Sequence, residues 1–137
     1  MRTPTELRSL YREHGLRVTP QRELVVRILS GNAAHPSADA VYQAARAEQP
    51  TISLKTVYQV LHDLNDLGEI QMLDLGTGSV RSDPNTSGHH HIVCNQCGAI
   101  VDVTVEALPE VPHDQMHGFQ VVSADVIFRG VCAACIT

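Results

Sequence analysis

Four cysteines, arranged as two pairs with the spacing CxxC, constrain the fold of this 137-residue chain more than any other feature. The pairs are Cys94 with Cys97 and Cys132 with Cys135, and they contain every cysteine of the sequence. Two such pairs are typical of a tetrahedral zinc ion with four thiolate ligands. A redox dithiol and free buried thiols are the alternatives. The pattern predicts a structural Zn²⁺ site that joins two distant segments of the chain.

Three consecutive histidines lie just before the first cysteine pair. The sequence predicts two antiparallel strands here, 89–93 and 99–103, joined by a turn at the cysteines. If the two cysteines face each other across this turn, His89 lies opposite Asp102. His91 then shares the face of His89, because side chains alternate along a strand.

Two imidazoles and a carboxylate on one strand face form a ligand set that Fe²⁺, Mn²⁺ and Zn²⁺ all accept. Solvated strand histidines are the alternative for His89 and His91. His90 points to the other face, and we expect it to be exposed or structural. The sequence therefore predicts two kinds of metal site.

The net charge of −5 comes entirely from the C-terminal part of the chain. Residues 1–82 hold nine Lys and Arg against nine Asp and Glu, whereas residues 83–137 hold one Arg against six acidic residues. Six arginines and three glutamates lie within residues 1–31. Phosphate contact requires a local basic face, which the net charge of a whole chain does not measure. Nucleic-acid binding therefore stays open for the N-terminal part.

Start and stop signals predict four short amphipathic helices before Gly68. Each helix begins after a Thr or Ser that can cap it, and each ends at a Gly or before a Pro. Segments 69–75 and 79–82 then flank a Gly-Thr-Gly turn and predict a two-stranded hairpin. Helices followed by a small hairpin indicate a winged helix-turn-helix. The four capping residues are Thr3, Thr19, Ser37 and Ser53.

The fourth predicted helix has one apolar arc and one polar arc. The polar arc carries Lys55, Tyr58 and Gln59, which such a motif directs toward bases and phosphates in the major groove. It also carries Asp63 and Asp66, which repel phosphate. An ordinary core helix with a solvated face is the alternative. The helix pattern alone favours the ordinary core helix over a DNA-reading helix, because the two aspartates count against contact with phosphate.

A polar run of turn-forming residues, SDPNTSG, separates these helices from a β-rich part. We place a winged-helix DNA-binding domain at 1–82, a hinge at 83–88 and a metal-binding domain at 89–137. The N-terminus lacks a signal-peptide pattern, and no stretch approaches the roughly 20 apolar residues of a membrane span. We expect a cytoplasmic protein without a membrane partner. In that reducing compartment, CxxC pairs favour metal binding over disulfides.

Five segments resemble successive signatures of the ferric uptake regulator family and cover nearly the whole chain. They are LRVTPQRELVVRIL, HPSADAVY, SLKTVYQVLHDLNDLGEI, HHHIVCNQCGAIVDV and FRGVCAAC. The resemblance implies an α+β protein, with an N-terminal winged helix-turn-helix domain and a small C-terminal α/β dimerisation domain that contains a four-cysteine zinc site. It implies a homodimeric, metal-responsive repressor that binds a palindromic double-stranded DNA operator.

The resemblance also implies roles for individual residues. The structural Zn²⁺ has the ligands Cys94, Cys97, Cys132 and Cys135. The regulatory Fe²⁺ or Mn²⁺ has the ligands His35, Asp83, His89, His91 and Asp102. Contacts with DNA are expected from Arg17, Arg22, Lys55, Thr56, Tyr58 and Gln59.

Two departures from the family pattern affect these expectations. Gly88 and Ala124 stand where many relatives carry histidines, so a further metal site is expected to be missing or crippled. Gln59 stands where arginine or asparagine is common. The operator of a relative therefore cannot be transferred to this chain.

The regulatory ligands resemble the peroxide-sensing branch more than the iron-uptake branch, because aspartates stand at 83 and 102. The resemblance implies a repressor of oxidative-stress defence genes, which releases DNA when peroxide oxidises His35 or His89. An iron- or zinc-homeostasis repressor with the same ligands is the alternative. A mononuclear non-haem iron enzyme is the alternative of another class. A catalyst needs open coordination positions, which His35 and Asp83 would fill, so we expect no enzyme.

Overall fold

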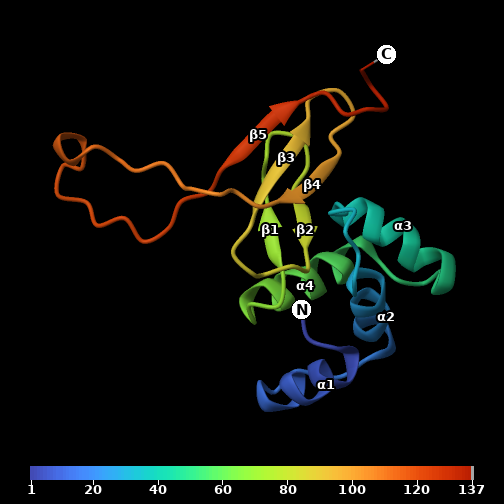
Figure 1. The fold of residues 1–137 in the computed structure, drawn as a ribbon. Coiled ribbons are helices and arrows are strands. Elements are labelled where there is room, and N and C mark those ends of the chain that lie inside the picture. Colours follow the sequence, from blue (N-terminus) through green and yellow to red (C-terminus); the bar gives the residue numbers. More distant parts are fainter. Residues whose placement is uncertain (137) are drawn as a thin grey trace. The chain divides into compact units, whose positions relative to one another are not determined.

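The structure is a computed structural model that describes residues 1–136. It divides into two compact units, Met1–Ser87 and a second unit that starts at Gly88 (Figure 1). Among the described residues, the first unit contains four α-helices and a two-stranded hairpin, and the second contains a three-stranded sheet. The predicted α+β class is therefore confirmed.

The helices of the first unit are α1 (Pro4–Glu13), α2 (Pro20–Leu29), α3 (Ala38–Glu48) and α4 (Leu54–Asp66). The residue before each helix is a Thr or Ser in extended conformation. Its side chain accepts a hydrogen bond from the backbone N–H three residues later. Such a bond satisfies one of the N–H groups that a helix start leaves without a partner. All four predicted helices are confirmed, each at its predicted cap.

One apolar core holds the four helices together. The predicted apolar arc of α4 lies in this core, and its polar arc is left on the surface. The buried core side chains are Leu7, Tyr11, Leu24, Val25, Val26, Leu29, Ala38, Val41, Ala45, Ile52, Val57, Val60, Leu61, Leu64 and Ile70.

No helix among the described residues is long and apolar enough to span a membrane.

The predicted wing is a hairpin of β1 (Gln71–Leu73) and β2 (Arg81–Asp83), which pair antiparallel. Strand β2 is also tied to the loop before α3, because the Ser82 N–H donates to the Pro36 carbonyl over 2.8 Å. Asp83, which the sequence analysis assigns to the hinge, is the last residue of β2 and is buried. The wing therefore includes a residue that was expected in the linker.

The sheet of the second unit has the order β4-β3-β5, with β3 (His90–Cys94), β4 (Ile100–Val103) and β5 (Ile127–Gly130). Strand β3 pairs antiparallel with β4 and parallel with β5. Figure 1 shows the connection from β4 to β5 as a long loop that leaves the sheet. Its helical part is a single 3₁₀ turn, His113–Gln115.

The predicted register between β3 and β4 is wrong by two residues. Asp102 lies opposite His91, not opposite His89. The reason is the turn at the first cysteine pair: the Cys94 N–H donates to the Ala99 carbonyl over 2.9 Å, and Gly98 has a φ of 75°. The turn thus closes between Cys94 and Ala99 rather than between two cysteines. Because strand side chains alternate with period two, the shift leaves the histidines on the face of Asp102.

We predict that Tyr11→Phe maintains or raises the free energy of unfolding at pH 7. The substitution removes a buried hydroxyl that has no hydrogen-bond partner among the described residues. Burial raises the pKa of Tyr11 from 10.0 to about 12. Between these pH values the unfolded chain loses the phenolic proton and the folded chain keeps it, so wild-type stability falls as the pH rises.

Urea unfolding followed by circular dichroism between neutral and strongly alkaline pH measures this decline. The Tyr11→Phe variant should lack the part of the decline that the buried phenol causes. Tyr58→Phe, at a side chain that is 44% exposed, is the control and should behave as wild type. Identical pH profiles for wild type and Tyr11→Phe would contradict the prediction.

Candidate metal centres and nucleic-acid interface

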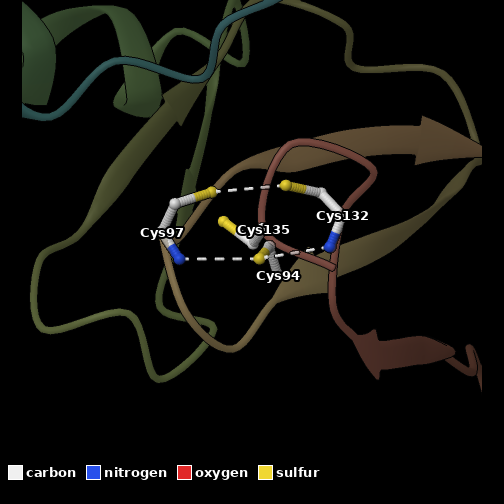
Figure 2. A group of neighbouring side chains, drawn as sticks. All are labelled: Cys94, Cys97, Cys132 and Cys135. Atoms are coloured by element: carbon white, nitrogen blue, oxygen red, sulfur yellow. Dashed lines mark hydrogen bonds between the residues drawn. The ribbon is translucent and has the colours of Figure 1, made fainter. Parts of the chain in front are cut away.

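Four sulfur atoms meet where the two CxxC turns approach each other (Figure 2). Cys94 is the last residue of β3 and Cys97 lies in the turn after it, whereas the second pair follows β5. All four Sγ atoms lie within 4.8 Å of one another, and Cys97 Sγ is 3.7 Å from Cys132 Sγ. Two sulfurs bound to one tetrahedral Zn²⁺ at about 2.3 Å lie about 3.8 Å apart. The sulfur cluster therefore fits a tetrahedral divalent ion.

Backbone N–H groups favour the thiolate form within this cluster. The Cys97 and Cys132 N–H groups both approach Cys94 Sγ, at 3.5 and 3.4 Å. These donors lower the pKa of Cys94 from 9.0 to about 6, because they stabilise the charged form. The pKa of Cys135 is raised to about 12 by hydrogen bonds with the thiols of Cys132 and Cys97. Four thiolates so close together need a cation to compensate their charge.

The first unit contains a buried pair of nitrogen and oxygen donors. His35 Nε2 lies 3.3 Å from Asp83 Oδ2, and the two side chains are 1% and 2% exposed. The hydrogen bond from Ser82 to Pro36 and a 3.3 Å bond from the Arg81 guanidinium to the His35 carbonyl hold the two chain segments together. His35 has a φ of 51°, a left-handed conformation that is uncommon outside glycine and often found at functional sites.

The second unit contains a group of three donors on the β3–β4 face. The Nε2 atoms of His89 and His91 each lie 3.2 Å from Asp102 Oδ1. The two imidazole rings meet edge to face, with centroids 4.7 Å apart. Their side chains are 6% and 7% exposed, so both imidazoles are largely shielded from water.

The donor separations in both units suit a divalent cation. Two nitrogen or oxygen donors bound to one ion at about 2.1 Å lie about 3.0 to 3.4 Å apart, for angles between octahedral and tetrahedral. The observed separations of 3.3 Å in the first unit and 3.2 Å in the second fall within this range. The donor atoms of the five predicted regulatory ligands thus converge within each unit.

His90 has a structural contact, as the sequence predicts. Its Nδ1 accepts a hydrogen bond of 3.0 Å from the Val126 N–H, just before β5. The imidazole therefore joins β3 to the end of the long connection that precedes β5.

A groove of about 420 Å³ lies between the loop before α2 and the first turns of α4. Five of the six residues predicted to contact DNA line it, and the sixth, Tyr58, is 44% exposed on α4. The five lining residues are Arg17, Arg22, Lys55, Thr56 and Gln59.

Three of these groove residues have partners that the sequence analysis did not identify. The Gln59 amide nitrogen donates a hydrogen bond of 3.0 Å to Asp63 Oδ1. The Thr56 hydroxyl lies 3.0 Å from the Ser53 hydroxyl at the start of α4. Arg22 forms a 3.4 Å ion pair with Asp63. For the contact between Gln59 and Asp63, the sequence did contain a signal: the two residues are four positions apart on one helix and therefore lie on the same face.

Comparison with known proteins identifies several relatives of the whole chain. The model of the ferric uptake regulator family matches residues 13–129. The peroxide-responsive repressor PerR of Staphylococcus aureus strain Mu50 is 40% identical over 126 residues, which cover 90% of this chain and 85% of the relative.

Solved structures are similar as well. The ferric uptake regulator Fur of Helicobacter pylori, which has three functional metal-binding sites, matches with a TM-score of 0.77 and 26% identity, over 98% of this chain and 94% of that one. PerR of Streptococcus pyogenes matches with a TM-score of 0.57 and 29% identity, also over 98% of this chain and 94% of that one.

We predict that Cys97→Ser lowers the Zn²⁺ content of the protein and disorders the second unit. The substitution removes one of four converging sulfurs, and a structural zinc ion contributes directly to folding. Metal analysis measures the zinc content, and amide hydrogen exchange measures protection in β3 and β5. Gln96→Ser, at an exposed position of the same turn, is the matched control and should keep both. Wild-type zinc content in Cys97→Ser would contradict the assignment.

Proposed function

We propose that this chain is a peroxide-responsive repressor. The chain belongs to the ferric uptake regulator family, and it is a metal-dependent transcriptional regulator rather than an enzyme. The observation that carries the proposal is the convergence of imidazole nitrogens and aspartate oxygens, at 3.2 to 3.3 Å, in each unit. The 40% identity to a peroxide-responsive repressor over 90% of the chain supports the choice of signal.

The four-cysteine cluster is proposed to hold a structural Zn²⁺ that does not take part in sensing. Sulfur donors at tetrahedral separations favour zinc, which has no redox chemistry of its own. A closed set of four protein ligands also leaves no coordination position for peroxide. Sensing is therefore assigned to the nitrogen and oxygen donors.

The regulatory ion, Fe²⁺ or Mn²⁺, is proposed to take ligands from both units. The pair His35 and Asp83 offers two donors, and the group of His89, His91 and Asp102 offers three. Neither set alone completes the coordination of an ion that prefers five or six ligands, whereas the two together do. An ion that needs all five binds most tightly to the arrangement that unites them, so it shifts the population toward that arrangement.

Operator binding is proposed to use the groove residues and α4 of two protomers. A two-fold homodimer presents two such helices to half-sites about one helical turn of DNA apart, which explains a palindromic operator. Exposed apolar side chains of the second unit support a homodimer, because an interface between two copies would remove them from water. They include Val101, Phe119, Val122, Phe128 and Ile136, exposed by 56%, 77%, 91%, 46% and 70%.

Peroxide is proposed to act on His35 or His89. A bound Fe²⁺ would catalyse this oxidation without being consumed. Peroxide is the two-electron oxidant: one of its oxygen atoms is inserted into an imidazole C–H bond and the other leaves as water. An oxidised imidazole is a poorer ligand than an imidazole, and it is also bulkier. The side chains of His35 and His89 are only 1% and 6% exposed, so there is little room for the added oxygen. Loss of this ligand removes the preference for the DNA-binding arrangement.

A second candidate function is a repressor that responds to the concentration of iron or zinc. The similarity to the Helicobacter pylori ferric uptake regulator, with a TM-score of 0.77, favours it. This candidate uses the same ligands and the same DNA-binding surface. It differs in the signal, so the response to peroxide separates the two.

We predict that His35→Asn strongly weakens metal-dependent binding to operator DNA. Asparagine tolerates the left-handed backbone of His35 but removes the imidazole donor. The apparent affinity for DNA at a fixed Mn²⁺ concentration should fall about tenfold or more, as is usual when a metal site loses support. Fluorescence anisotropy with a duplex enriched by the wild-type protein measures this affinity.

His117→Asn is the matched control for this experiment. His117 also has a positive φ, 48°, but it is exposed and is not a proposed ligand. The His117→Asn variant should bind DNA as the wild-type protein does. Metal-dependent binding that survives in His35→Asn would exclude His35 from the regulatory site.

We predict that iron-loaded protein gains one oxygen atom on a peptide that contains His35 or His89 after sub-stoichiometric peroxide. Binding to DNA should decline in parallel. Peptide mass spectrometry locates the added oxygen, and Mn²⁺-loaded protein treated in the same way is the control. Unmodified peptides and intact DNA binding after this treatment would favour the metal-concentration sensor.

A further inference from the structure

Asp63 on α4 is the centre of a small polar network at the groove. Its Oδ2 lies 3.4 Å from the Arg22 guanidinium, and its Oδ1 accepts a hydrogen bond of 3.0 Å from the Gln59 amide nitrogen. The side chains of Arg22 and Asp63 are 19% and 14% exposed, so this ion pair is largely shielded from water. Asp63 therefore contacts two of the residues that were expected to bind DNA.

Arg22 is committed to groups within the first unit. Besides Asp63, it donates a 2.5 Å hydrogen bond to the Arg17 carbonyl, and its guanidinium carbon lies 5.7 Å from the centroid of the Tyr11 ring. These contacts connect α1, the loop before α2, α2 and α4. Arg22 thus positions α4 against the other helices, and Asp63 compensates its charge.

The bond from Gln59 to Asp63 fixes which way the exposed Gln59 amide faces. A carboxylate accepts hydrogen bonds and does not donate them, so it holds the NH₂ end of the amide. The Gln59 carbonyl oxygen and the second N–H are then left to face outward from the helix. Gln59 also lines the groove, where it can meet the edge of a base.

One acceptor beside one donor matches adenine and not guanine. In the major groove adenine presents its N7 acceptor and its N6 donor, which pair with a glutamine amide in a bidentate fashion. Guanine presents two acceptors, N7 and O6, and the second would face the glutamine carbonyl oxygen. A glutamine whose side-chain amide group cannot flip therefore favours adenine.

We propose that Asp63 is a positioning residue for operator recognition, which holds the Gln59 amide so that α4 reads adenine over guanine at one base pair of each half-site. The inference rests on the proposed DNA-binding function and extends it to base preference. It also gives a role to an aspartate on the DNA-facing arc, where its charge alone would oppose phosphate.

The test compares wild type with Asp63→Asn in the full-length, Mn²⁺-loaded protein. An asparagine amide can donate to the Gln59 carbonyl, which turns both Gln59 N–H groups outward and suits the two acceptors of guanine. A randomised duplex library is first enriched with wild-type protein. Gln59→Ala then identifies the base pair that Gln59 reads, as the position where the preference is lost.

Wild type should favour adenine over guanine at this position by about tenfold or more, the discrimination expected of a good bidentate pair. Asp63→Asn should reduce the ratio to within about threefold. Asp66→Asn is the matched control, because Asp66 is an exposed aspartate on the same helix. Both variants should bind all duplexes somewhat more tightly, since each removes one negative charge, but only Asp63→Asn should change the ratio.

The outcomes separate the inference from the function on which it rests. If wild type enriches no sequence, DNA recognition itself fails and the inference fails with it. If wild type enriches a sequence but Asp63→Asn keeps the adenine preference, or Gln59→Ala loses no preference, the role of Asp63 is overturned while the repressor function stands. If thermal unfolding shows that Asp63→Asn is destabilised by the unpaired Arg22, the double variant Arg22→Met, Asp63→Asn replaces it in the same assay.

Discussion

The cluster of four sulfur atoms is the constraint on which the second unit depends. Among the described residues of this unit, the buried hydrophobic side chains are Val93, Cys94 and Ile100, which is too few for a core that is stable by itself. The sulfurs lie where the cysteine turn at the end of β3 meets the turn after β5, so an ion held by them would link these segments in place of a large apolar core. The same cysteine turn sets the register of β3 and β4 and thereby brings Asp102 to the histidines.

Backbone pairing performs the equivalent task in the first unit. His35 lies in a loop and Asp83 at the end of a strand, 48 residues apart in the sequence. The hydrogen bond from Ser82 to Pro36 brings the two segments together, and the two buried side chains are kept from water. In each half of the proposed regulatory site, contacts within one unit therefore hold the donors near one another. An ion with ligands in both units, as proposed above, can then respond to how the units are arranged, because the donors within each unit have to move little.

The sequence allowed the helices to be predicted well, because capping is a local interaction between residues three positions apart. The register of β3 and β4 was predicted wrongly, because it depends on how many residues the cysteine turn encloses, and the spacing of cysteines does not specify this. The grouping of His91 with Asp102 survived the error, since a shift of two conserves the face. The pairing of His35 with Asp83 depends on a long-range backbone contact, which only the family resemblance pointed to.

The first unit shows why a count of charges is a poor guide to DNA binding. Four of the six arginines within residues 1–31 form ion pairs with acidic side chains, so they offer less attraction to phosphate than their number indicates. The pairs also neutralise four acidic residues that would otherwise repel DNA, Asp63 among them. Arg17 and Lys55 remain exposed along the groove. The positive potential at the proposed interface therefore depends on these two side chains. Of the paired charges, Arg22 and Asp63 join α2 to α4, and the other pairs join other parts of the first unit.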